Sequence, residues 1–135
     1  MDTTGGCRAL AAGAVCGLRT MCGPATIVPL AGTPRIVVIV LAVGELIADK
    51  LPQTPPRTQP LGLIARAVTA SISAASTAEG RDRVPAALLG IGAAMGSAFA
   101  GAAYRSWCAR RRLPAIPCAL LEDAVAYGAG TLLAR

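Results

Sequence analysis

The chain is short, apolar and basic, and these properties exclude most classes of soluble enzyme. It has 135 residues, of which 54% are hydrophobic and 15% charged, with a formal net charge of +6. In soluble domains about a quarter of the residues are charged. Histidine is absent, which excludes Ser-His-Asp and Cys-His catalysis and His-ligated zinc or haem. We therefore predict a multi-pass membrane protein with a single domain over residues 1–135.

The apolar residues are mostly small or aliphatic. One Trp, two Tyr and one Phe are too few to anchor a soluble core, whereas 15 glycines suit closely packed membrane helices. The basic residues are scattered except at Arg110–Arg112 and have no aromatic interleaving, so we expect no nucleic-acid partner. We predict the cell inner (cytoplasmic) membrane as the location, with the lipid bilayer as partner.

Five apolar segments approach the length of about 20 residues that a helix needs to cross a bilayer. They cover approximately residues 8–31, 34–50, 61–79, 84–105 and 115–134. The fold class that they predict is an all-α polytopic transmembrane bundle of about five helices, or four if the short second segment does not span. Gly23-Pro24 should break the first helix, because proline removes an amide donor and clashes with the preceding turn.

The loops predict an orientation, because cytoplasmic loops carry more Lys and Arg. With five spans, seven basic residues fall on the side of the N-terminus and four on the other. We therefore expect a cytoplasmic N-terminus and an external C-terminus. The first set is Arg8, Lys50, Arg57, Arg105, Arg110, Arg111 and Arg112, and the second is Arg35, Arg81, Arg83 and Arg135.

Small residues four apart mark helix faces that can pack closely. The first segment has Gly13 and Gly17, and the fourth has Gly92 with Gly96 and Ser97 with Gly101. We expect them to pack helices within one subunit, with homo-oligomerisation as the alternative. The five cysteines show no CxxC pair, and Cys16 and Cys22 are expected to be small packing residues.

Several charged residues fall within or near the ends of the apolar segments, where each costs about 2.5 to 3.5 kcal/mol at the bilayer centre. Such side chains must face each other or water. Glu45 and Asp49 share a helix face, whereas Glu122 and Asp123 diverge, so only one of the latter is expected to point at a common cluster. The charges in question are Arg19, Glu45, Asp49, Arg66, Glu122 and Asp123.

A polar face in the third segment and the break in the first segment predict a polar interior. Arg66, Thr69, Ser73 and Ser76 follow one helix face in the third segment. A broken first helix would expose backbone amides and carbonyls at depth, which membrane proteins tolerate where these groups line a cavity or bind a ligand.

The run ELIADKLPQTPPR over 45–57, together with GLRT at 17–20, GLIARA at 62–67 and LPAIPCALLEDAVA at 113–126, resembles a bacterial membrane protein family known as domain of unknown function four-one-two-six. The resemblance covers nearly the whole chain. It implies an integral membrane protein without an established activity. The positions that it marks are Arg19, Glu45, Asp49, Lys50, Pro52, Arg57, Arg66, Glu122 and Asp123.

Three functions fit these patterns. The first is a transporter or channel-like protein that uses the Arg, Glu and Asp cluster as its substrate or ion site. The second is a membrane enzyme acting on lipid or phosphate groups, and the third is a structural or assembly subunit. We favour transport over an enzyme, because no reaction can be assembled from residues with named roles. No catalytic residue, cofactor or metal is predicted.

Overall fold

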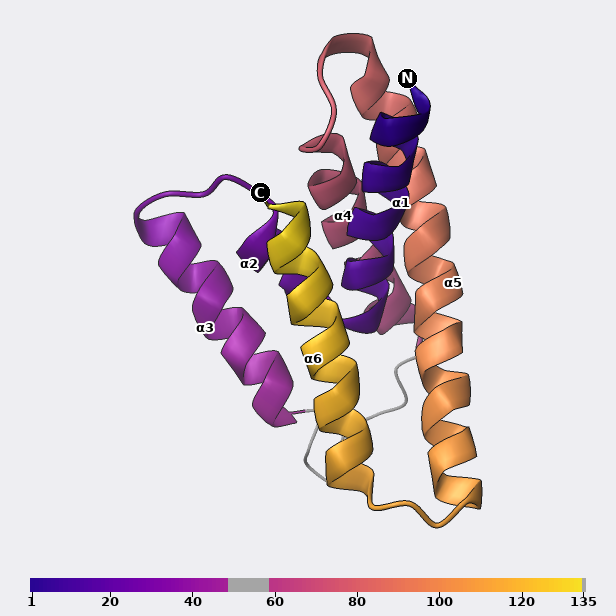
Figure 1. Ribbon diagram of the computed structural model, residues 1–135. Coiled ribbons are helices and arrows are strands. Elements are labelled where there is room, and N and C mark those ends of the chain that lie inside the picture. Colours follow the sequence, from indigo (N-terminus) through magenta and orange to yellow (C-terminus); the bar gives the residue numbers. More distant parts are fainter. Residues whose placement is uncertain (49–58, 135) are drawn as a thin grey trace.

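The computed structural model describes residues 1–48 and 59–134, and these residues form an all-helical bundle (Figure 1). The predicted all-α class is therefore confirmed. The helix count differs from the predicted five, because the first apolar segment forms two helices. Within the described residues the elements are α1 (Thr3–Leu18), α2 (Cys22–Thr26), α3 (Thr33–Ala48), α4 (Pro60–Ala75), the 3-10 turn η1 (Gly80–Asp82), α5 (Arg83–Arg110) and α6 (Ala115–Leu133).

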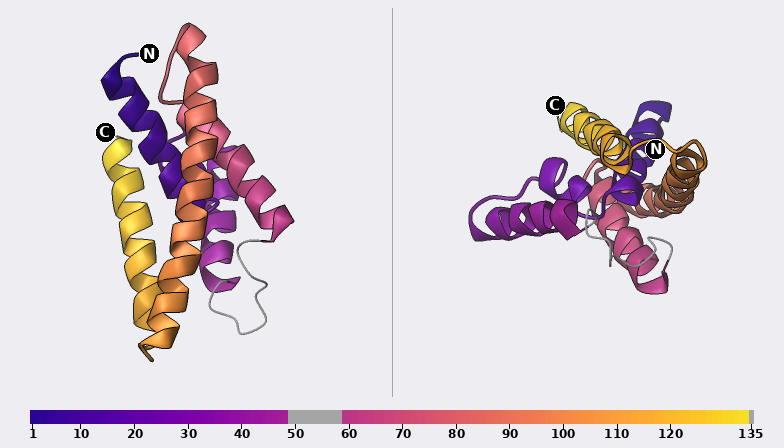
Figure 2. Two further views of the ribbon diagram at one scale, coloured as in Figure 1. Left: turned by 90° about the vertical axis from the view of Figure 1, so that its right-hand side faces the viewer. Right: turned by 90° about the horizontal axis from the view of Figure 1, so that it is seen from below.

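Three helices make the centre of the bundle, and α3 stands apart. The closest packing joins α1, α4 and α5, while α6 lies along α1 and α5. The views in Figure 2 show α3 set to one side, where it packs mainly against the short α2. Two stretches, Gly80–Arg110 and Ala115–Leu133, are long and apolar enough to cross a membrane.

The first helix is broken, but earlier than Gly23-Pro24. Helix α1 ends at Leu18, because Arg19 is extended with φ of −141°. Pro24 lies in the first turn of α2, where a missing amide is tolerated. A continuous helix would drive the proline ring into the carbonyl of residue 20, so the break falls in the preceding turn.

Contacts with α6 show that α1 and α2 form a hairpin. Arg8 on α1 donates to the carbonyl of Leu133 at the end of α6, at 3.2 Å. Arg19 is ion-paired with Asp123, near the middle of α6. After the turn, Thr26 of α2 lies against Gly130, closer to the end of α6 again. The chain therefore runs halfway along α6, turns at Arg19–Met21 and comes back.

Both termini lie at one end of the bundle, which we call the terminal end (Figure 1). The amino group of Met1 pairs with Asp82 at 3.1 Å, and Arg8 reaches Leu133. The opposite end carries Arg110–Arg112 and is called the arginine end. The hairpin brings both termini to one end of the bundle, whereas five successive end-to-end helices, as predicted, would leave them at opposite ends. Arg8 lies at the terminal end with the N-terminus, whereas Arg110–Arg112 lie at the opposite end, so the arginines that predicted a cytoplasmic N-terminus do not share one end.

The centre of the bundle is packed by glycine, alanine and serine. A Cβ on Gly13 would collide with the backbone of Gly90, and one on Gly17 would meet Ser97. The Ser97 hydroxyl donates to the carbonyl of Ala14 at 2.8 Å, so α1 and α5 nearly touch along their backbones. A Cβ on Gly101 would lie 3.2 Å from Glu122.

Gly92 and Gly96 do not take part in this packing. Both are exposed, and among the described residues nothing lies within 4 Å of a Cβ built on either. The expectation that they pack against another helix of the same chain is wrong here. They lie on the outward face of α5, since α1 and α4 cover the face that carries Gly90, Ala94 and Ala98.

Candidate functional site

Four charged residues from four helical segments meet at the turn of the α1–α2 hairpin. We call Arg19, Glu45, Arg66 and Asp123 the charged cluster. Arg19 is fully buried, and Arg66 and Asp123 are 5% and 8% exposed. They come from the hairpin turn, α3, α4 and α6. The structure thus brings together four of the residues that the sequence singled out for their cost in lipid.

Arg19 and Asp123 form an ion pair inside the bundle. The guanidinium contacts the Asp123 carboxylate directly. Asp123 lies near the middle of α6, one of the two helices long enough to span a membrane. Each charge offsets the cost of burying the other, and a buried charge left without its partner typically destabilises a protein by about 3–5 kcal/mol.

Glu45 holds the backbone at the hairpin turn. Its Oε1 accepts a hydrogen bond from the Thr20 amide at 2.8 Å, and its Oε2 accepts one from the Met21 amide at 2.9 Å. These amides lie just before α2, where the first N–H groups of a helix have no partner within the helix. One carboxylate from α3 therefore caps the start of α2.

Arg66 binds a backbone carbonyl at the end of α1. Its Nε donates to the carbonyl of Gly17 at 3.1 Å, and its Nη1 donates to the carbonyl of Gly62 on its own helix at 3.3 Å. The last carbonyls of a helix also lack partners within the helix. Side chains of opposite charge thus supply hydrogen-bond partners to the two helix ends at the break.

A second ion pair lies next to the charged cluster. Arg105 Nε donates to Glu122 Oε2 at 2.9 Å, and the two side chains are 31% and 4% exposed. Glu122 and Asp123 therefore engage different arginines, and the divergence of the two acids on the helix is consistent with this. The sequence predicts Arg105 in a basic loop, but α5 continues to Arg110, and Arg105 pairs with Glu122 on α6. An apolar pattern that continues past Arg105 is the sequence signal for this longer helix.

The predicted polar face of α4 is largely confirmed. Arg66, Thr69 and Ser73 are buried, whereas Ser76 is exposed. A Cβ on Gly23 would collide with Cys16 and lie 2.6 Å from Ser73 Oγ. The hairpin therefore rests against the polar face of α4. The predicted site residues Asp49, Lys50 and Arg57 lie outside the described residues.

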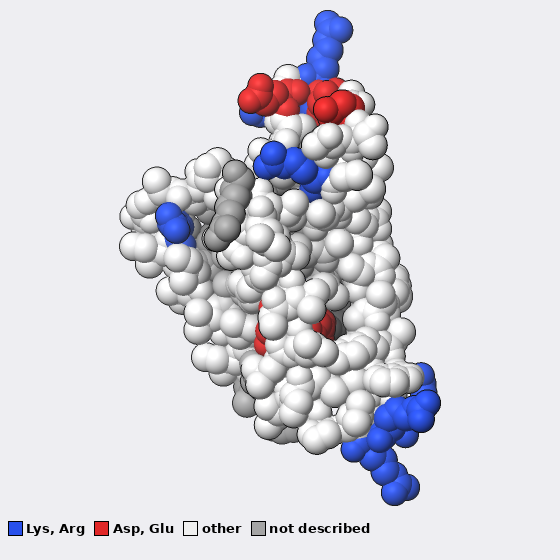
Figure 3. Space-filling view, viewed as in Figure 1, with Lys and Arg blue, Asp and Glu red and all other residues white. Residues whose placement is uncertain are grey.

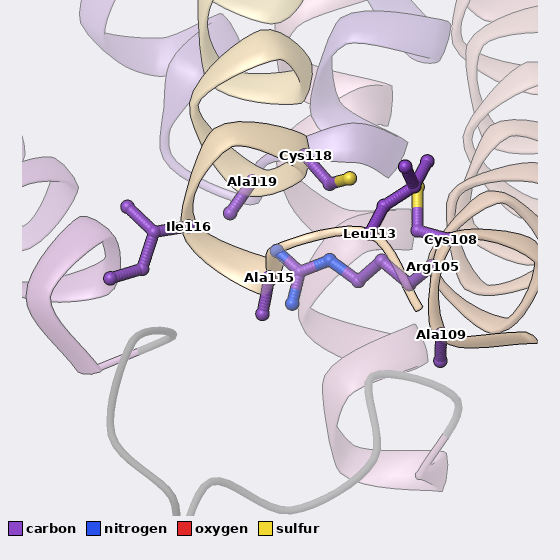
Figure 4. Close-up of a pocket in the computed structure, with 8 residues that line it drawn as sticks. All are labelled: Arg105, Cys108, Ala109, Leu113, Ala115, Ile116, Cys118 and Ala119. Carbon is purple, nitrogen blue, oxygen red and sulfur yellow. The ribbon is translucent and has the colours of Figure 1, made fainter. Parts of the chain in front are cut away.

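Three cavities open on the described part of the bundle. A cavity of about 260 Å³ is lined by Arg105, Cys108 and Cys118 near the arginine end (Figure 4). Another of about 290 Å³ is lined by Leu18, Tyr104 and Glu122, and a third of about 200 Å³ lies beside α2. None of these three is lined by a member of the charged cluster. Within residues 1–48 and 59–134, no three Cys, Asp or Glu side chains gather as a metal site would need.

No family model, curated protein or solved structure matches the chain. The family resemblance of the sequence therefore stays a prediction.

Proposed function

We propose that this chain lies in a lipid bilayer as a polytopic membrane protein. Helix α3 supports this most directly, because seven of its large apolar side chains are at least 43% exposed. A helix that is apolar on all sides belongs in a protein core or in lipid, and α3 is not in the core. The seven residues are Ile36, Val37, Ile39, Val40, Leu41, Val43 and Ile47.

The distribution of charge supports the same placement. On the face that Figure 3 shows, most charged side chains lie toward the two ends of the bundle, and the surface between them is mostly uncharged, with a few charged atoms near mid-height. Near the arginine end, Tyr104 stacks on Trp107 with ring centroids 6.4 Å apart, and Arg111 lies 5.8 Å from the Trp107 ring. Trp and Tyr beside Arg are typical of the boundary between lipid and water.

Within the membrane, the function that the geometry supports best is transport of a small ion. The observation that carries this proposal is the hairpin turn at Arg19–Met21, which lies level with the middle of α6 and is surrounded by the charged cluster. Broken helices with charged side chains at mid-depth are how many transporters build their ion sites. Plain apolar helices would serve a purely supporting role without the cost of these charges.

The Arg19–Asp123 pair is the part of this arrangement that can exchange. Asp123 can release Arg19 and take a proton or a cation, while Glu45 and Arg66 keep the hairpin turn in place through their backbone contacts. Such a site binds in one state and releases in another without moving a whole helix.

Proteoliposomes with a pH-sensitive dye inside test this proposal. We expect wild-type protein to dissipate an imposed proton or cation gradient faster than protein-free liposomes do. Asp123→Asn should lower that flux at least about tenfold, equivalent to about 1.4 kcal/mol in the barrier. Glu79→Gln is the matched control, because Glu79 is an exposed acid far from the charged cluster, and its flux should equal that of wild type.

A flux no greater than that of empty liposomes, from protein with native helix content, would contradict transport. That result would favour a second candidate, a structural membrane subunit. The observation behind this alternative is that Glu45 and Arg66 are both bound to backbone groups of the hairpin. Loss of stability in Asp123→Asn without any change in flux would also favour a structural subunit.

A further inference from the structure

Two cysteines face each other where α5 meets α6, at the arginine end. Cys108 and Cys118 are 3% and 8% exposed and line the same cavity. Figure 4 shows the two sulfur atoms on facing helices, beside the cavity of about 260 Å³ that Arg105 also lines.

The surrounding structure holds these two thiols in register. One helical turn away, Arg105 and Glu122 form the ion pair that joins the same two helices. On the other side, the Leu113 amide donates to the carbonyl of Cys108 at 3.0 Å, which closes a tight turn after α5. Arg112 in that turn has a φ of 55°, the left-handed conformation that often ends a helix. The pair is thus fixed on both sides.

The other cysteines lack this arrangement. Cys7 is exposed, while Cys16 and Cys22 are fully buried in the centre of the bundle. Of the three best-formed cavities, none is lined by Cys7, Cys16 or Cys22. Only Cys108 and Cys118 combine a facing thiol with space beside it for a reagent.

We propose that Cys108 and Cys118 are a redox-active dithiol that a small anionic disulfide converts to a disulfide bond. The cavity admits the sulfur end of the reagent, and Arg105 together with Arg110–Arg112 attracts its carboxylates. This proposal is independent of transport.

The reaction is a thiol–disulfide exchange in two steps. One cysteine loses its proton and attacks the small disulfide, which breaks the small S–S bond, forms a mixed disulfide and releases one small thiol. The second cysteine loses its proton and attacks the protein sulfur of the mixed disulfide. The Cys108–Cys118 bond forms, and the second small thiol leaves. Two protein thiols are oxidised, one small disulfide is reduced to two thiols, and both protons end on those thiols.

The test uses the full chain in detergent micelles with oxidised glutathione as the anionic probe. After alkylation of the remaining thiols, trypsin cuts at Arg110–Arg112 and separates the two cysteines. We expect mass spectrometry to find the peptide 106–110 linked to the peptide 113–135, and two of the five thiols protected from alkylation. Cys118→Ser should instead hold one glutathione on Cys108 as a mixed disulfide. Cys7→Ser is the control and should form the same link as wild type.

The charge of the reagent is tested with hydroxyethyl disulfide, which is neutral. We expect oxidised glutathione to form the link at least about tenfold faster at low salt, and this advantage to shrink as salt is added. Equal rates would overturn the role of the arginines. A folded wild-type protein that forms no link between Cys108 and Cys118, or that links Cys16 with Cys22 instead, would overturn the whole proposal.

Discussion

At the scale of single residues, the charged side chains of the cluster bind backbone groups as well as one another. The carboxylate of Glu45 accepts hydrogen bonds from two backbone amides, and Arg66 donates one to a backbone carbonyl. All three backbone groups lie at helix ends beside the hairpin turn, away from the two ends of the bundle. In lipid no water is present to satisfy such groups. The sequence predicted which side chains were costly, because that depends on their type and position alone. It did not predict their partners, because these come from helices far apart in the chain.

Replacing Glu45 with glutamine should weaken the hairpin turn. The amide side chain keeps one acceptor oxygen, and its NH₂ group then faces a backbone N–H that has lost its acceptor. We expect Glu45→Gln to lower the free energy of unfolding by about 1–3 kcal/mol. The measurement is a denaturant titration in detergent micelles followed by circular dichroism.

Glu79→Gln is again the appropriate control for Glu45→Gln, since it makes the same chemical change at an exposed position. Its unfolding midpoint should stay at the wild-type value. If the two variants unfolded at the same denaturant concentration, the capping role of Glu45 would be wrong.

At the scale of helices, close approach between α1 and α5 depends on which face of α5 carries each glycine. A spacing of four residues predicts that two glycines share a face, but it does not indicate where that face points. Gly90 therefore lies against α1 and α4, while Gly92 and Gly96 lie on the opposite side. The break in the first helix shows a similar limit. The proline predicted a break, and its place in the first turn of α2 moved that break upstream.

Alanine substitutions distinguish the two faces. The Cβ of Gly13→Ala would collide with the Gly90 backbone, which cannot move aside as a flexible side chain could. We expect a loss of about 1–3 kcal/mol in the free energy of unfolding. Gly92→Ala meets open space and should leave stability unchanged or raise it by up to about 1 kcal/mol, since alanine favours helix.

The same unfolding titration compares the two alanine variants under identical conditions. A loss of stability in Gly92→Ala equal to that in Gly13→Ala would show that the outward face of α5 is also packed, as a second copy of the chain would pack it.

At the scale of the whole molecule, the hairpin determines the topology. The sequence predicted the helical class and most helix positions, because long apolar runs bounded by prolines are strong local patterns. It did not predict that the first apolar segment turns back, because such a segment has the same composition as one that continues. The contacts of Arg8, Arg19 and Thr26 with α6 show the reversal.

The two termini should therefore lie on the same side of the membrane. In sealed vesicles, tags on both ends should be cut together by an added protease or protected together. A cysteine introduced by Arg111→Cys, in a background with the five native cysteines replaced by serine or alanine, should react with an impermeant reagent from the opposite side. Protection of one terminal tag and cleavage of the other would contradict the fold.

The pairing of Arg19 with Asp123 also has a consequence for the order of assembly. The hairpin is made first, but the acid that neutralises its turn belongs to the last helix. Until that helix is synthesised, Arg19 has no access to Asp123, and an arginine in lipid without a counterion is costly. In the proposed bilayer placement, we therefore expect the hairpin to reach its final depth only after α6 has been made. A chain truncated before α6 should leave its N-terminal hairpin at the membrane surface.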